Sequence, residues 1–148
     1  MHLKTLGILE HNMERKWKVD FDDDFTSEFS RFSDPVRQKI ISLAEVLKVF
    51  GPQLAGSIVR TLNGSKHSNM KELRFNADNG VWRVAFAFDV KQAAILLVGG
   101  DKSGVSQDKF YRNLIEIADR RFDQHQLKLT NKRKKNDGLF RGDDRSGI

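Results

Sequence analysis

Residues 71–101, KELRFNADNGVWRVAFAFDVKQAAILLVGGD, contain three apolar segments that two short turn-rich pieces separate. The segments are Lys71–Asn76, Val81–Asp89 and Ala93–Gly99, and their length and composition predict three β-strands. Because so few residues connect them, the strands are expected to pair as an antiparallel meander. The remaining segments are expected to pack around this sheet.

The middle strand predicts a sheet with two different faces. One side of it is bulky and apolar, with Trp82, Val84, Phe86 and Phe88, and the other side is small except for one arginine, with Arg83, Ala85, Ala87 and Asp89. In the preceding strand Leu73 and Phe75 take the bulky side, so Arg74 is expected on the same open face as Arg83. An open face with small side chains and two arginines suits a partner that carries phosphate.

A further strand is expected before the meander. Residues Lys16–Phe21 alternate between apolar and charged side chains, as in an amphipathic strand. The aspartates that follow, Asp22, Asp23 and Asp24, lack the glycine and the closing glutamate of a calcium loop. They are therefore expected to cap a helix and to complement its dipole.

Residues 22–33 and 34–50 predict a helical hairpin. Their apolar residues recur at helical spacing, and they include Phe25, Phe29, Phe32, Val36, Ile40, Leu43 and Leu47. Asp34 is expected to be the N-cap of the second helix, with Pro35 as its first residue, and Gly51 is expected to end it. Because an isolated hairpin cannot bury its apolar side, we expect it to lie on the bulky face of the sheet.

Two connections offer polar side chains to the open face. Residues 53–70 are rich in Gly, Ser and Asn, predict a loop, and bring Lys66 and His67 toward the strand that begins at Lys71. His67 has no partner at metal-ligand spacing, so it is either a solvated side chain or a proton-transfer group. The loop that follows the meander carries Lys102, and its glycines match neither the phosphate loop of nucleotide hydrolases nor a dinucleotide fingerprint.

The C-terminal part predicts one helix and a tail. Ser106 is a suitable cap, and an apolar stripe continues to about His125. Tyr111 is off that stripe and is expected near Lys102. Residues 127–148 are basic and have little apolar content, so they are expected to form a flexible tail.

Bulk properties narrow the class of protein. The 148 residues suit one domain, and no apolar run approaches the ~18 residues of a membrane span. The N-terminal segment is too short and too broken for a secretory signal, so a cytoplasmic location is expected. There is no cysteine, which excludes disulfides, thiolate nucleophiles and Cys-ligated zinc.

The net charge of +6 is unevenly distributed. Residues 1–50 carry 8 basic and 9 acidic groups, residues 51–126 carry 11 and 8, and residues 127–148 carry 7 and 3. The excess of positive charge thus lies on the sheet region and the tail, where a polyanion could bind.

Four segments together resemble the RelE/ParE superfamily of type II toxins, and in particular its HigB-like, phage Gp49-related branch. They are KELRF, VWRVAFAFD, AILLVGGDKSG and FYRNLIEIADRRF, and the resemblance covers residues 16–126. It implies an α+β fold, in which a helical hairpin packs on one face of a twisted, mainly antiparallel sheet that a C-terminal helix closes. The chain then divides into an extension (1–13), a RelE-like domain (14–126) and the basic tail (127–148).

The resemblance also implies an activity and partners. Many members are ribosome-dependent endoribonucleases that cut mRNA, and each is neutralised by an antitoxin encoded beside it. In HigB-like pairs that antitoxin is commonly a helix-turn-helix DNA-binding protein, HigA-like. No metal, cofactor or membrane is implied.

Site residues follow from the matched motifs and from the chemistry of RNA cleavage. Attack of a 2′-OH on the adjacent phosphorus requires a held phosphate, stabilised negative charge and proton transfer. Arg74 and Arg83 suit a bidentate hold on phosphate, Lys102 suits the developing charge, and His67 or Tyr111 could move protons. Further RNA contacts are expected from Lys66, Lys71 and Lys109.

Two other functions stay open at this point. ParE-like members of the same superfamily poison DNA gyrase through a protein contact, and a non-catalytic RNA-binding or ribosome-binding module would need only the cationic face. Each arginine also has a purely structural interpretation. Arg74 could pair with Glu72 or Asp89, and Arg83 could only make a strand soluble.

Overall fold

The structure is a computed structural model that describes residues 17–146. The expected extension, residues 1–13, lies outside this range. The elements in chain order are β1 (Lys18–Phe21), α2 (Asp23–Phe29), α3 (Asp34–Phe50), the short 3-10 turn η1 (Gly51–Gln53), β2 (Val59–Thr61), β3 (Lys71–Ala77), β4 (Gly80–Phe88), β5 (Ala93–Asp101) and α4 (Gln107–Ser146).

Within the described residues the strands form one five-stranded sheet in the order β1-β5-β4-β3-β2. The meander of β3, β4 and β5 is antiparallel, as predicted, and β1 joins its edge parallel to β5. Strand β2 was missed, because residues 53–70 were expected to be a loop. Its three residues are too few to show an alternating pattern, and pairing with β3 through Val59 and Leu73 defines it.

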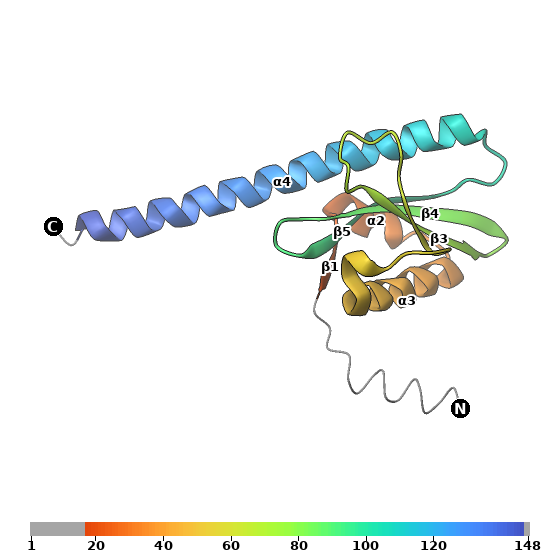
Figure 1. Cartoon of the computed structure of the whole chain (residues 1–148), viewed down its shortest axis with the longest axis horizontal. Helices are drawn as coiled ribbons and strands as arrows, with labels where there is room; N and C mark the ends of the chain where they lie inside the picture. Colours follow the sequence, from red (N-terminus) through yellow and green to blue (C-terminus); the bar gives the residue numbers. More distant parts are fainter. Residues whose placement is uncertain (1–16, 147–148) are drawn as a thin grey trace, which may run out of the picture.

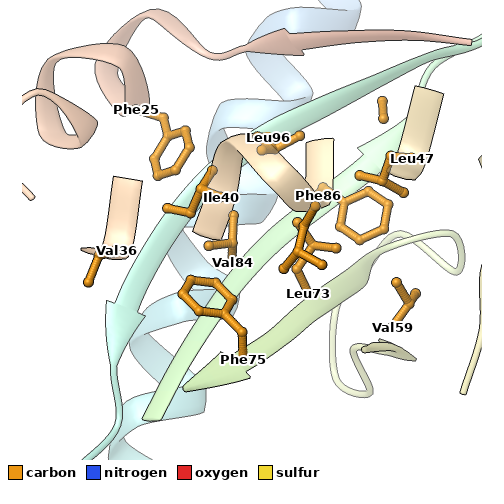
Figure 2. Close-up of a cluster of buried hydrophobic side chains, with 12 residues drawn as sticks. Phe25, Val36, Ile40, Leu47, Val59, Leu73, Phe75, Val84, Phe86 and Leu96 are labelled. Carbon is orange, nitrogen blue, oxygen red and sulfur yellow. The ribbon is translucent and has the colours of Figure 1, made fainter. Parts of the chain in front are cut away.

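The bulky face of the sheet is covered by α2 and α3, which confirms the predicted position of the helical hairpin (Figure 1). Phe25 of α2 and Ile40 of α3 have no exposed surface and pack against Val84, Phe86 and Leu96 from the sheet (Figure 2). Burying side chains of this size contributes about 1.5–3 kcal/mol each. The hairpin and the sheet therefore stabilise each other.

Local sequence signals account for where α2 and α3 begin. The Asp22 carboxylate accepts a hydrogen bond from the Phe25 backbone N–H at 3.1 Å, so the aspartates cap α2 as predicted. The N-cap of α3 is Ser33, so the prediction that Asp34 is the cap was one residue late. Asp34 and Pro35 instead occupy the first turn, where both favour a helix start.

The small face of the sheet is covered by α4, so the expectation of an open face is wrong over most of its area (Figure 1). Leu114, Ala118 and Phe122 of the helix are buried against the sheet, where Ala85 and Ala87 have no exposed surface. The small side chains of β4 make room for a helix at close range. Only the part of this face beside the start of α4 is left for a ligand.

Helix α4 continues to Ser146, so the predicted helix end near His125 is wrong. Its C-terminal end projects beyond the sheet (Figure 1). The tail has little apolar content, which argued against its packing on the core. Lysine and arginine nevertheless favour a helix without such packing. Within residues 17–146, none of the helices combines the length and the apolar content that crossing a membrane requires.

Candidate active site

A cleft of about 730 Å³ lies where β2, β3 and the loop after β5 meet the first turns of α4. Its charged and hydrogen-bonding lining includes Arg60, Glu72, Arg74, Lys102, Tyr111 and Arg112. Basic side chains outnumber acidic ones in this lining, so the cleft suits an anion.

The floor of the cleft is a three-residue hydrogen-bonded cluster. The Tyr111 hydroxyl donates to Oε1 of Glu72 at 3.1 Å and accepts from Nε of Arg83 at 3.2 Å. Arg83 Nε also lies 3.6 Å from the same carboxylate oxygen. Glu72 and Arg83 are 4% and 5% exposed, so the pair is almost fully removed from water.

Strand pairing determines which arginines lie at the cleft. Arg74 and Arg83 are directly opposed in the register of β3 and β4, which confirms that they share a face. They differ in exposure, because α4 covers Arg83 while Arg74 keeps 27% of its side chain accessible and lines the cleft. Arg74 Nε lies 3.8 Å from Glu72, so the structural interpretation of Arg74 as an ion-pair partner also holds.

Lys102 lines the cleft from the loop that follows β5. Its backbone N–H donates to the Val81 carbonyl at 2.8 Å, and the neighbouring Asp101 carboxylate accepts from Val81 N–H at 3.0 Å and Ser103 N–H at 2.9 Å. These bonds hold the loop against β4. The Lys102 ammonium lies 6.0 Å from the centre of the Tyr111 ring, within the range of a cation–π contact.

Burial changes the acidity of two of these groups. It raises the pKa of Glu72 above the ordinary value of 4.5, although the Tyr111 hydrogen bond and then Arg83 and Arg74 oppose the change. Burial also raises the pKa of Tyr111 above 10.0, against the hydrogen bond from Arg83. Glu72 is thus a stronger base than an ordinary glutamate, and Tyr111 keeps its proton at neutral pH.

Glu72 carries a further unusual feature. Its second oxygen, Oε2, is buried and has no hydrogen-bond partner among the residues that the structure describes. Buried carboxylate oxygens are nearly always hydrogen-bonded. This unpaired acceptor belongs to a residue that lines the cationic cleft.

Four of the expected site residues lie together, and four lie elsewhere. Arg74, Arg83, Lys102 and Tyr111 form the cleft and its floor. Lys66 and His67, which were expected beside the open face, do not line this cleft. Lys71 points to the other side and donates to the Pro52 carbonyl at 3.5 Å, and Lys109 lines a separate depression with Phe110 and Val98.

The loop with Lys66 and His67 packs against the side of α4. His67 Nε2 lies 2.8 Å from Asp123, its ring packs edge-on against Phe122, and the Lys66 ammonium forms an ion pair with the same aspartate. Ser65 donates to Asp119. These polar contacts hold the loop on the helix.

Sequence reasoning named Glu72 only as a partner for Arg74, and it missed Arg60 and Arg112. The signal for Glu72 was available, since a residue two positions before Arg74 points to the same sheet face. Arg60 could not be placed without β2. Among the side chains of residues 17–136, no group of three or more histidine or acidic residues lies close enough to hold a metal ion.

The chain thus folds as an α+β protein in which a hydrogen-bonded Glu–Tyr–Arg cluster lies beneath a cationic cleft at one end of the sheet. The chain belongs to the family described as "Phage derived protein Gp49-like (DUF891)", whose model matches residues 27–123. The expected membership of the HigB-like, Gp49-related branch is thereby confirmed.

Two proteins of Mycobacterium tuberculosis that carry the toxin names HigB2 and HigB3 are similar in sequence. The first is 39% identical over 87 residues, which are 58% of this chain and 43% of that protein. The second is 46% identical over 77 residues, which are 52% of this chain and 65% of that protein. The matched regions thus cover only part of each relative.

The fold resembles that of a mutant of the E. coli toxin RelE in the free state. The two structures superpose with a TM-score of 0.50 at 11% sequence identity, over 68% of this chain and 94% of that one. The predicted RelE-like fold is confirmed by this likeness. At so low an identity the likeness concerns the fold alone.

Proposed function

We propose that this protein is a toxin of the HigB/RelE type and that it acts as a ribosome-dependent endoribonuclease on translated mRNA. The observation that carries the proposal is the Glu72–Tyr111–Arg83 cluster beneath a cleft with Arg74 and Lys102. It combines a base of raised pKa, a neutral hydroxyl and several cations, which are the groups that metal-free RNA cleavage uses.

The cations would hold the scissile phosphate. Arg74 is the exposed arginine of the pair, and its planar guanidinium can give two parallel hydrogen bonds to phosphate oxygens. Arg83 is buried and keeps Tyr111 and Glu72 in place. It would therefore act on the substrate only through its hydrogen bond to Tyr111. Arg60 and Arg112 would extend the contact to the neighbouring phosphates.

Glu72 and Tyr111 would remove the proton of the attacking hydroxyl. Tyr111 remains protonated at neutral pH, so we assign it the role of a relay that accepts the 2′-OH proton while its own proton passes to Glu72. The raised pKa of Glu72 brings its basicity closer to neutral pH, which favours this transfer.

Lys102 would assist the leaving group. The 2′-oxygen forms a bond to phosphorus, the bond from phosphorus to the 5′-oxygen breaks, and Lys102 donates a proton to that oxygen. The products are a 2′,3′-cyclic phosphate and a 5′-hydroxyl. Glu72 then releases its proton to water and Lys102 regains one, which restores the starting state.

Partners and location follow from the same proposal. The ribosome would present the mRNA, and a helix-turn-helix antitoxin of the HigA type would neutralise the protein in the cytoplasm. Among expected contacts, Lys66, His67, Lys71 and Lys109 lie outside the cleft, so they would act as outer RNA contacts or in the fold and not on the reacting phosphate.

The test is cleavage of a translated mRNA in a purified translation system. Wild type should produce fragments only while the message is translated, and Arg74→Ala with Lys102→Ala should lower the rate by about 10²–10⁴-fold. Lys39→Ala, at an exposed lysine of α3 on the other side of the sheet, controls for the loss of one surface charge. An unchanged rate in the double variant would refute the site. Intact mRNA together with DNA damage in expressing cells would instead identify a gyrase poison.

A further inference from the structure

A second cationic groove lies far from the cleft, between the turn that joins β4 to β5 and the outer half of α4. It is lined by Val90, Lys91, Gln126, Leu129, Lys132 and Arg133, with Thr130 and Asn136 completing it. In Figure 1 this turn and the middle of α4 lie side by side at the end of the sheet from which the helix projects. The helical residues of this groove follow residue 123, where the family match ends.

The charge of this region has one sign. Residues 127–136, LKLTNKRKKN, contain five basic residues and no acidic one. All of these basic side chains are exposed, and Lys128 forms an ion pair with Asp23 at 3.5 Å. Lys91 adds a further cation from the opposite wall.

The composition favours a nucleic acid over a protein as the occupant. Protein interfaces are enriched in aromatic residues and depleted of lysine, whereas this groove has no aromatic side chain and is rich in lysine and arginine. Val90 and Leu129 are the apolar residues of its lining. A row of lysine and arginine side chains along a groove is typical of contacts to phosphate.

The polar side chains at the two ends of the groove fit RNA in particular. Gln126 and Asn136 each carry an amide that both donates and accepts hydrogen bonds. Such groups can bind a 2′-hydroxyl, which is both donor and acceptor and distinguishes RNA from DNA.

We propose that this groove is a second RNA-binding site, which holds the phosphate backbone of folded RNA while the cleft acts elsewhere. Arg133 lies 22 residues beyond Tyr111 on the same helix, which places the groove roughly 33 Å from the cleft at the helical rise per residue. The groove therefore contributes affinity and position and does not take part in bond cleavage. The choice of RNA as the partner of this groove rests on the proposed function.

Helix geometry provides a matched control for the test. At about 3.6 residues per turn, Lys134 and Lys135 point away from the side of α4 that carries Leu129 and Arg133, and neither lines the groove. Lys132→Ala/Arg133→Ala and Lys134→Ala/Lys135→Ala thus remove the same charge from the same helix. Lys91→Ala tests the opposite wall without altering the helix.

Binding is measured by fluorescence anisotropy with a labelled RNA hairpin over a series of salt concentrations, and circular dichroism checks the helical content of each variant. The groove pair should weaken binding about tenfold or more and reduce the slope of log K against log salt by about 2, and Lys91→Ala should reduce it by about 1. The control pair should change affinity by less than about twofold. Equal effects of the two pairs, or no effect of Lys91→Ala, would overturn the groove as a site.

The same samples separate this proposal from the proposed function. In the translation assay the groove pair should raise KM with little change in kcat, while Arg74→Ala/Lys102→Ala should lose cleavage and should weaken hairpin binding less than the groove pair does. If wild type binds the hairpin through the groove but cuts no mRNA, only the proposed function fails. If wild type cuts mRNA and the groove pair and the control pair bind and cut alike, only the groove fails. If the groove pair instead loses binding to an acidic protein partner, the surface would be reassigned to that partner.

Discussion

The Nε atom of Arg83 in β4 donates a hydrogen bond to the Tyr111 hydroxyl of α4 at 3.2 Å. This bond joins the centre of the sheet to the start of the last helix, and the Tyr111 hydroxyl in turn donates a hydrogen bond to Glu72. The cleft therefore depends on how α4 docks on the sheet, which makes the tyrosine hydroxyl the first group to test.

Tyr111→Phe removes one hydroxyl that serves two buried partners. We expect it to lower the free energy of unfolding by about 1–3 kcal/mol, because Glu72 and Arg83 each lose a hydrogen bond. RNA cleavage should fall by about 10²–10⁴-fold through loss of the relay. Urea unfolding and the translation assay measure the two effects, and a variant that cuts at the wild-type rate would remove Tyr111 from the mechanism.

Arg74→Lys keeps the positive charge at the cleft but removes the planar fork. If Arg74 holds phosphate through paired hydrogen bonds, lysine should restore only part of the activity that Arg74→Ala loses. Cleavage rates of both variants with the same message decide the point. Equal activity of the lysine variant and wild type would show that only charge matters at this position.

Glu72→Gln should change how stability depends on pH. The folded-state pKa of Glu72 is raised, so the native state holds this proton more tightly than the unfolded chain does. Wild type should therefore lose stability relative to Glu72→Gln as pH rises from the ordinary value of 4.5 through the raised one, and the difference should be constant above it. Denaturant unfolding of both proteins between about pH 4 and about pH 8 measures this difference in stability. An increase in the stability of wild type relative to Glu72→Gln as pH rises would contradict the assignment.

His67→Ala should affect the fold more than the chemistry. The His67 ring contacts Asp123 and Phe122, and 16% of its side chain is exposed, so the substitution should cost about 1–3 kcal/mol. The cleavage rate per folded molecule should stay within about twofold of wild type, since His67 does not line the cleft. A large loss of kcat at unchanged stability would restore His67 as a proton-transfer group.

Gly51→Ala should destabilise the protein strongly. Gly51 ends α3 at a φ of 57° and a ψ of −141°, and an added Cβ atom would lie 2.3 Å from the Trp17 ring. Both the backbone and the close approach require glycine. Thermal unfolding should show that the free energy of unfolding falls by about 3 kcal/mol. Gly56→Ala, at a glycine whose Cβ would meet no atom within 4 Å, should cost less and controls for backbone strain alone.

Much of the fold was predictable because it depends on patterns with short periods. Alternation along β3 and β4 determined both faces of the meander and placed Arg74 and Arg83 on the same face. The spacing of Phe25, Phe29 and Phe32 determined the apolar side of the hairpin, and only one sheet face was bulky enough to receive it.

Contacts between distant segments decided the rest. The position of α4 on the small face could not be inferred from alternation, since alanines suit both a ligand and a closely packed helix. That docking buries Arg83, raises the pKa of Glu72 and ties His67 to Asp123. The sequence alone thus determined which residues share a face, whereas only the tertiary structure decided which of them are covered, because burial depends on the neighbour that packs against them.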